Sequence, residues 1–130
     1  MRSQVGNVCA IAQKRGIAAF VVDGVIRDLA EIRGNGFPVF ARGIMPIPGG
    51  KDVLDLMNAP VRCGGIVVEP NDVLVADEEG IVVVPHAKHV DVLQKAQARA
   101  AKDAAETLES WEAAHHARIE QILRSKGFID

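Results

Sequence analysis

Several residue types that define particular protein classes are scarce or absent in this chain. Tyr is absent, Trp occurs once and Phe four times, so the core has to be built mainly from Val, Ile, Leu and Ala. There is no run of about 20 apolar residues, so no membrane-spanning segment is expected. The net charge of -2, without a cluster of Lys or Arg, gives no electrostatic reason to expect a nucleic-acid partner.

Cysteine is also rare, because only Cys9 and Cys63 are present and they lie far apart in the chain. One disulfide is arithmetically allowed, but no apolar targeting core is visible at the amino terminus, which favours a reducing compartment. We therefore expect two buried free thiols and a cytoplasmic location. The 130 residues are 48% hydrophobic and 25% charged, which is typical of one globular domain spanning residues 1–130.

The first forty residues predict a strand, a helix and a second strand after an opening helix. Apolar spacing favours a helix over roughly the first fifteen residues, and the apolar run 17–22 favours a strand buried on both faces. Asp23 and Gly24 are expected to end this strand, and residues 25–33 read as a short helix facing inward. A new strand at residues 37–40 completes a βαβ unit with parallel strands.

The middle of the chain differs in composition from the first forty residues. Residues 43–50 are rich in Gly and Pro and predict an irregular loop. The β-rich runs 61–68, 73–76 and 81–84, separated by turn residues, predict a compact antiparallel meander. Within the first run, the pair Gly64 and Gly65 indicates a tight bend or bulge in the sheet.

The carboxyl-terminal third predicts a long helix at about residues 86–126, or two helices in series, because it is rich in Ala, Lys, Arg and Glu and lacks Gly and Pro. Its apolar surface exceeds what the strands can cover, so we expect its partner on another subunit, with Trp111 as an interface or core anchor. His86 and His89 lack the Cys or carboxylate that would complete a zinc spacing, and we interpret them as ordinary surface histidines.

The densest functional signal lies where the first strand is expected to turn into a helix. There, Arg27 can bind a carboxylate or an enolate oxygen, and Asp28 can ligate a hard cation. The simpler alternative is that Asp23 or Asp28 stabilises the first helical turn and Arg27 makes a surface ion pair. Arg42 and Lys51 flank the Gly-rich loop and are candidates for binding distal substrate carboxylates, with a solvated loop as the alternative.

Several segments, in one order, resemble the RraA-like family, which includes the 4-hydroxy-4-methyl-2-oxoglutarate and 4-carboxy-4-hydroxy-2-oxoadipate aldolases. The similarity runs from about Val5 to the start of the last helix. The matching segments are residues 22–28 (VDGVIRD), 37–43 (FPVFARG), 58–61 (NAPV), 63–65 (CGG), 70–73 (PNDV) and 76–85 (ADEEGIVVVP).

The resemblance implies an α/β fold of the swivelling β/β/α type, here partial, with a long carboxyl-terminal helix. It also implies a homotrimer or a dimer of trimers with sites between subunits. Family members carry a further region before the position of Val5, so we expect this chain to be the carboxyl-terminal portion of such a domain, a fragment or a shortened variant.

The same resemblance implies a divalent-metal-dependent pyruvate aldolase with oxaloacetate decarboxylase side activity. Arg27 would bind the pyruvyl carboxylate and the enolate oxygen, and Asp28 would help to hold Mg²⁺ or Mn²⁺. The family's water-ordering Asp, twenty-one residues before the catalytic Arg, corresponds to Gly6, with Asn7 beside it as the counterpart after a one-residue shift.

Two further implications leave alternatives open. Family aldolases borrow an acidic residue from a neighbouring subunit's last helix, which Asp103 or Glu106 matches by position; plain solvated charges are the alternative. The family also has a regulatory branch that inhibits RNase E and typically lacks the metal-binding Asp. Retention of Asp28 favours the enzyme, and a non-enzymatic binding module or a truncated inactive fragment is the alternative.

Overall fold

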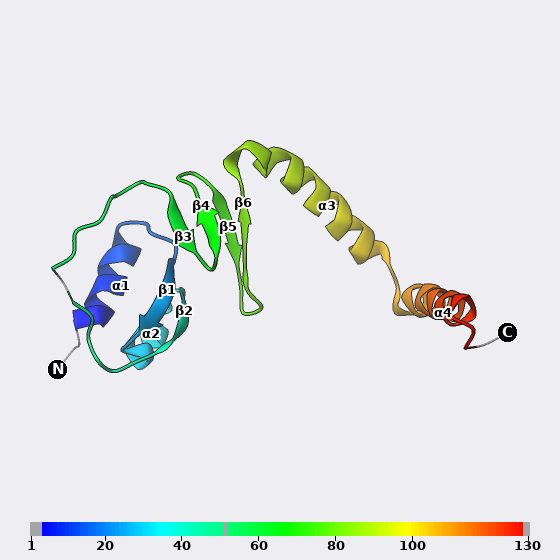
Figure 1. Ribbon diagram of the computed structural model, residues 1–130, viewed down its shortest axis with the longest axis horizontal. Coiled ribbons are helices and arrows are strands. Elements are labelled where there is room, and N and C mark those ends of the chain that lie inside the picture. The colour runs from blue at the N-terminus through cyan, green and yellow to red at the C-terminus, as the bar shows by residue number, and fades with distance from the viewer. Residues whose placement is uncertain (1–3, 51, 129–130) are drawn as a thin grey trace. The chain divides into compact units, whose positions relative to one another are not determined.

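The computed structural model describes residues 4–50 and 52–128, and the chain divides into two compact units at residues 70 and 71. Figure 1 shows their elements along the chain. The first unit contains α1 (Gln4–Lys14), β1 (Phe20–Ile26), α2 (Leu29–Asn35), β2 (Val39–Ile44), β3 (Val61–Cys63) and β4 (Ile66–Val68). The second contains β5 (Val73–Ala76), β6 (Ile81–Val84), a 3-10 turn (His86–Lys88), α3 (His89–Ala105) and α4 (Leu108–Ser125).

The predicted βαβ unit is confirmed, since β1 and β2 pair in parallel and α2 connects them (Figure 1). The predicted opening helix is confirmed as α1 over the residues described. Gly36 ends α2 in the left-handed conformation with φ of 64°, a geometry that glycine adopts without the clash of a Cβ.

The boundary between the first strand and the helix was predicted wrongly. Asp23 and Gly24 do not end the strand, because β1 continues through them to Ile26, and α2 begins only at Leu29. The register shifts between Val22 and Val25, so that two residues of β1 lie opposite one residue of β2. Such a bulge admits a Gly within a strand and redirects the residues that follow it.

The core of the first unit lies between its helices and the β1–β2 pair. Cys9 and Ala12 of α1, Ile32 of α2 and Phe37 are buried, and the rings of Phe20 and Phe37 meet edge to face at 5.0 Å. Burial raises the pKa of the Cys9 thiol. The expectation of two buried free thiols is therefore confirmed for Cys9, whereas Cys63 is free but only half-buried.

The predicted meander is instead two separate hairpins within the described residues. β3 pairs with β4, and β5 pairs with β6, each as a two-stranded antiparallel sheet. The run 61–68 is split by Gly64 and Gly65, with φ of 61° and 86°, which confirms the predicted tight bend. Positive φ at both central residues is what a two-residue hairpin turn requires.

The carboxyl-terminal third forms two helices in series, which was one of the two predicted arrangements. Glu106 is extended and ends α3, and Thr107 begins α4 with a capping box: the Thr107 hydroxyl accepts from the Ser110 N–H, and the Ser110 hydroxyl accepts from the Thr107 N–H. This reciprocal capping favours a helix start at Thr107 over continuation of α3. No helix of residues 4–50 and 52–128 is long and apolar enough to cross a membrane.

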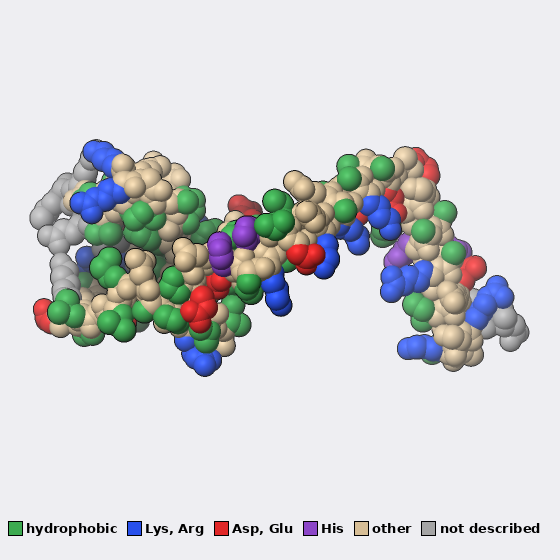
Figure 2. Space-filling model, turned by 90° about the horizontal axis from the view of Figure 1, so that it is seen from above, with side chains coloured by type: hydrophobic (Ala, Val, Ile, Leu, Met, Phe, Trp, Pro, Cys, Tyr) green, Lys and Arg blue, Asp and Glu red, His purple; other side chains and the backbone are tan. Residues whose placement is uncertain are grey.

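Neither α3 nor α4 buries a residue in this chain, and apolar side chains reach the surface over both (Figure 2). Trp111 is half-exposed and stacks on His115 with ring centroids 4.8 Å apart, so within the chain it is no core anchor. The rings of His86 and His89 also stack. A partner for these helices on another subunit stays a prediction.

Ile32→Ala should destabilise the first unit by about 2–5 kcal/mol, because it removes a buried side chain from the small core around α2. Urea unfolding followed by circular dichroism measures this change. Ile44→Ala is the matched control, since Ile44 is 61% exposed in β2 and its truncation leaves no cavity. Equal losses for both variants would contradict the assigned core.

Candidate active site at the end of strand β1

The two residues with the clearest functional signal lie where β1 ends. Arg27 and Asp28 occupy the two positions between Ile26, the last residue of β1, and Leu29, the first residue of α2. Their side chains are 26% and 22% exposed, so each is partly withdrawn from water. The bulge at Asp23 and Gly24 determines which residue ends the strand and hence where this pair lies.

Asp28 has a left-handed backbone, with φ of 61° and ψ of 36°. A non-glycine residue there costs of the order of 1 kcal/mol or more, and such residues concentrate at functional sites. Asp28 occupies the N-cap position of α2, yet its side chain makes no capping hydrogen bond. The alternative in which Asp23 stabilises the first helical turn is wrong, because Asp23 lies within β1, whereas Asp28 does stand at the start of that turn, without a side-chain cap.

One oxygen of the Asp28 carboxylate, Oδ2, is buried without a hydrogen-bond partner. The Nε atom of Arg27 lies 3.4 Å from it, close enough for an ion pair but without a hydrogen bond. A buried carboxylate oxygen usually has hydrogen-bond partners, because its desolvation is costly. A buried carboxylate oxygen that is paired with a cation but accepts no hydrogen bond is thus an unusual feature.

A cavity of about 480 Å³ lies beside Arg27. It is bounded by Val8 and Cys9 of α1, by apolar residues of β1 and β2, and by residues 45–49. Small-molecule sites commonly have volumes of about 300–1,000 Å³. The cavity therefore places Arg27 and two residues of α1, Val8 and Cys9, around one ligand-sized space.

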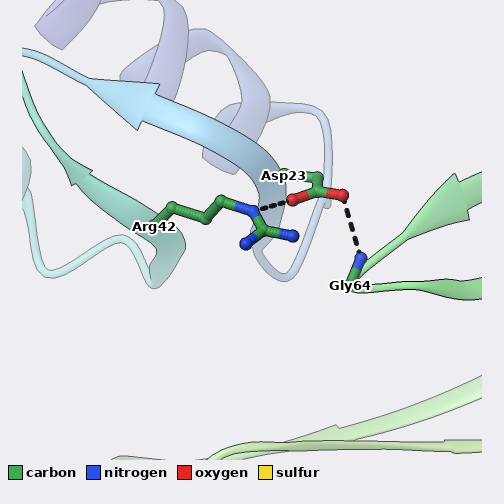
Figure 3. Close-up of polar contacts among 3 residues, drawn as sticks. All are labelled: Asp23, Arg42 and Gly64. Atoms are coloured by element: carbon green, nitrogen blue, oxygen red, sulfur yellow. Dashed lines mark hydrogen bonds and ion pairs between the residues drawn. The ribbon is translucent and has the colours of Figure 1, made fainter.

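A second polar cluster joins three segments of the first unit (Figure 3). Asp23 Oδ1 accepts a hydrogen bond from Arg42 Nε, and Asp23 Oδ2 accepts one from the N–H of Gly64 at 3.0 Å. The bond from Arg42, followed by that from Gly64, lowers the pKa of Asp23, and the Asp23 carboxylate raises the pKa of Arg42. Asp23 thus ties β1 to β2 and to the β3–β4 turn.

The remaining predicted substrate residues stay predictions. Arg42 is engaged by Asp23 and does not line the cavity beside Arg27. Gly6 and Asn7 lie in the first turn of α1, and Asn7 is exposed. The surroundings of Gly6 lie outside what the structure describes, and Lys51 lies outside the described residues.

The two candidates for a trans-subunit acid belong to the second unit. Asp103 accepts from Arg99 Nε at 2.7 Å in an exposed ion pair one helical turn apart. Glu106 is exposed at the end of α3. A role for either in a neighbouring subunit's site stays a prediction.

The residues around Asp28 fit a hard divalent cation bound through few protein ligands. Across residues 4–50 and 52–128, no three His, Cys, Asp or Glu side chains gather to hold a metal. Mg²⁺ is often held by one or two carboxylates, with water and substrate filling its other positions. The Asp28 carboxylate could supply one such ligand, whereas a zinc site made of three or four protein ligands has no counterpart among these residues.

Comparison with known proteins agrees with this arrangement. The family model described as Aldolase/RraA, RraA-like, matches residues 4–83, which include the end of β1, the cavity, the first hairpin and all but the last residue of the second. The chain belongs to the RraA-like family. A family relative from Halalkalibacterium halodurans, named "Putative 4-hydroxy-4-methyl-2-oxoglutarate aldolase", is 40% identical over 98 residues, covering 75% of this chain and 47% of that protein.

Solved RraA-like structures show the same fold. An uncharacterized protein from Pseudomonas syringae pv. tomato is 30% identical with a TM-score of 0.67, over 80% of this chain and 56% of that one. The RNA-processing inhibitor RraA from Thermus thermophilis is 31% identical with a TM-score of 0.57, over 62% and 49%. The chain thus has the predicted RraA-like α/β fold, and it spans about half the length of the relatives it matches.

Sequence reasoning missed the Asp23 cluster as a structural link. The signal for it was the Gly directly after Asp23 inside an apolar, β-branched run, because an isolated Gly in a strand pattern often marks a bulge. The partners Arg42 and Gly64 lie 19 and 41 residues from Asp23. No local pattern links positions so far apart.

The Asp23 cluster should make stability depend on pH in acid. Because its folded-state pKa is lowered, Asp23 contributes stability that is present above its unfolded pKa of about 3.9 and lost as pH falls through the folded value. Asp23→Asn should therefore be less stable than wild type at pH 7, with the difference shrinking towards pH 3. Urea midpoints at both pH values measure this.

Asp55→Asn is the control for this experiment, because the Asp55 side chain accepts only from its neighbour Leu56 in the described contacts. Its difference from wild type should change little between the two pH values. A deficit for Asp23→Asn that is the same at pH 7 and pH 3 would refute the charge contribution.

Proposed function

We propose that this chain carries the site of a divalent-metal-dependent pyruvate aldolase, which cleaves 4-hydroxy-2-oxo acids and decarboxylates oxaloacetate as a side activity. The single observation that supports this most is the buried Oδ2 of Asp28, which accepts no hydrogen bond, beside Arg27 at the end of β1. The aldolase names given to relatives such as the Halalkalibacterium protein agree with it.

In the proposed cleavage the C3–C4 bond breaks. The 4-hydroxyl loses its proton and becomes the carbonyl of the departing product, and the bonding electrons pass into the enolate of pyruvate. Protonation at C3 then yields pyruvate. In oxaloacetate the same bond breaks with loss of CO₂ and leaves the same enolate, so one site that stabilises this enolate serves both reactions.

Arg27 is the group that would recognise the shared part of these substrates. Arg27 lines the cavity and its guanidinium is permanently charged, so it can bind the 2-oxo acid carboxylate and oppose the charge that develops on the enolate oxygen. The proximity of Asp28 orients the guanidinium through the ion pair. Because both residues lie at the end of a paired strand, their positions are fixed before substrate arrives.

Asp28 would hold Mg²⁺ or Mn²⁺, directly or through water. Such a cation, when bound, supplies Lewis-acid polarisation of the keto oxygen. Gly6 and Asn7 stand at the family's water-ordering position, and the Asn7 amide would hydrogen-bond water there. Arg42 would lie further out, held by Asp23.

We further propose that the protein works in the cytoplasm as a homotrimer or a dimer of trimers, with Asp103 or Glu106 completing the site of a neighbouring subunit. The exposed apolar side chains of α3 and α4, among them Leu93 and Trp111, support a role in assembly. These helices bury no residue within the chain, which favours a covering partner.

A non-enzymatic regulator is the second candidate. The likeness to the solved RNA-processing inhibitor supports it. The free oxygen of Asp28 argues for the enzyme, because a protein that acts only by binding another protein has no need of an unpartnered buried acceptor. A truncated, inactive fragment is the third reading, and the activity measurement below distinguishes all three.

Arg27→Ala should lower kcat/KM for pyruvate release by about 100- to 1,000-fold, because a fixed cation opposite the developing enolate is removed. Coupled lactate dehydrogenase assays with oxaloacetate and with 4-hydroxy-4-methyl-2-oxoglutarate measure this. Arg33→Ala, an exposed change in α2, is the control and should retain activity. Release without divalent metal, or full activity in Arg27→Ala, would contradict the proposal.

Asp28→Asn should weaken the apparent affinity for Mg²⁺ roughly 10- to 100-fold while keeping the fold, since Asn also tolerates a left-handed backbone. Titration of EDTA-treated protein with MgCl₂, followed by activity and by calorimetry, measures it. Unchanged metal affinity would remove Asp28 from the cation site. A folded, oligomeric wild type that binds no metal and releases no pyruvate would favour the regulator, and an aggregated one the fragment.

Subunit mixing tests the proposed shared site. Arg27→Ala and Glu106→Gln, or Asp103→Asn, should each be weak alone and regain activity when dissociated and reassembled together, in up to about a quarter of sites, because some sites then receive both intact residues. A mixture of Arg27→Ala with Asp28→Asn is the matched control, since both residues come from one subunit. Recovery equal to that control would contradict a trans-subunit acid.

A further inference from the structure

The bulge in β1 does not depend on the conformational freedom of its glycine. Neither Asp23 nor Gly24 has a left-handed backbone. Among the described residues, a Cβ at Gly24 would meet only Val22 Cγ1, at an ordinary contact distance of 3.8 Å. The backbone at the bulge is thus open to residues other than glycine. What the structure shows at the bulge instead is a pair of hydrogen bonds to the Asp23 carboxylate.

The two donors to this carboxylate come from different segments (Figure 3). Arg42 is the single residue of β2 that lies opposite Asp23 and Gly24, and its Nε donates to Asp23 Oδ1. Gly64, in the β3–β4 turn, donates its backbone N–H to Asp23 Oδ2 at 3.0 Å. Hydrogen bonds to an ionised carboxylate are stronger than those between neutral groups. The Asp23 side chain therefore holds the bulge to β2 and to the hairpin that follows.

The register that follows the bulge determines where Arg27 lies. Ile26 pairs with Ile44, and its carbonyl accepts from the Met45 N–H at 2.8 Å, directly before Arg27. In a strand without the bulge, each residue after Asp23 would pair one position further along β2. Arg27 would then move by about 3.3 Å, and the side chains before it would change sides. A displacement of about 1 Å in a catalytic group can already lower a rate about 100-fold.

We propose that Asp23 is a positioning residue of the candidate site, which keeps Arg27 and Asp28 in place by holding the bulge against Arg42 and Gly64. The inference rests on the proposed function and adds to it a residue that touches neither substrate nor cation. Asp23 is not among the described residues that line the cavity. Its effect is therefore transmitted through the backbone of β1.

A double-mutant cycle with Arg27 separates positioning from stability. Asp23→Ala removes both acceptors and should lower kcat/KM for pyruvate release from oxaloacetate with Mg²⁺ by about 10- to 100-fold. In the Arg27→Ala background the same change should cost at least about fivefold less, because a group that Asp23 positions is already absent. A role in stability alone would lower activity by one factor in both backgrounds, through the folded fraction that circular dichroism measures. Equal losses in both would overturn the inference.

Two further variants sharpen the cycle. Gly24→Ala is the matched control from the same bulge and should keep wild-type activity, because its Cβ meets no close neighbour among the described residues. Asp23→Asn keeps one carbonyl acceptor, so its loss should be smaller than that of Asp23→Ala and should depend on Arg27 in the same way. A loss in Gly24→Ala as large as that in Asp23→Ala would contradict the assignment to the carboxylate.

Binding of oxalate, a dianion shaped like the pyruvate enolate, gives a readout without turnover. Calorimetry in MgCl₂ should show about tenfold weaker binding to Asp23→Ala than to wild type. An active wild type whose pyruvate release and oxalate binding are unchanged by Asp23→Ala would refute the positioning role and leave the aldolase. A wild type that neither releases pyruvate nor binds oxalate would refute the proposed function and this inference with it.

Discussion

The geometry of the whole candidate site depends on the irregular pairing of β1 with β2. Two residues of β1, Asp23 and Gly24, lie opposite one residue of β2, and the ladder resumes at Val25. Because side chains alternate along a strand, this extra residue changes which side each later residue faces. The carboxylate of Asp23 holds the irregular stretch to Arg42 and to Gly64, so the bulge is fixed from two directions.

Asp28, which follows β1, combines backbone strain with a carboxylate oxygen that accepts no hydrogen bond. Asp28 has a costly backbone, caps nothing with its side chain, and buries an oxygen that accepts no hydrogen bond. Each feature alone destabilises the fold slightly, and neither improves packing. In the proposed site, a bound cation would offset the cost of burying this carboxylate oxygen beside Arg27.

The sequence predicted the types of the secondary-structure elements better than the residues at which they begin and end. Local apolar spacing was enough for α1, the parallel strand pair and the Gly64–Gly65 bend. It failed at residues 23–26, because Gly inside a strand looks like a stop unless the partner strand is known. The break at Thr107 was not located because its cap uses Ser110 in place of the usual Glu or Gln, a weaker signal. Arg27 and Asp28 were found as adjacent residues of a family motif, whereas the free oxygen and the apolar cavity require three-dimensional packing.

The left-handed turn at Asp28 has a consequence for how such a protein can change over evolutionary time. Asn and Gly are the residues that adopt this backbone most readily, and both lack the negative charge. Replacement of Asp28 by Gly would relieve the backbone strain, and replacement by Asn would preserve the backbone conformation. Either change would remove the carboxylate, and selection for stability would not oppose it. For the proposed aldolase, the fold would therefore offer a short path from a catalyst to a protein that only binds, through one substitution that leaves the scaffold intact.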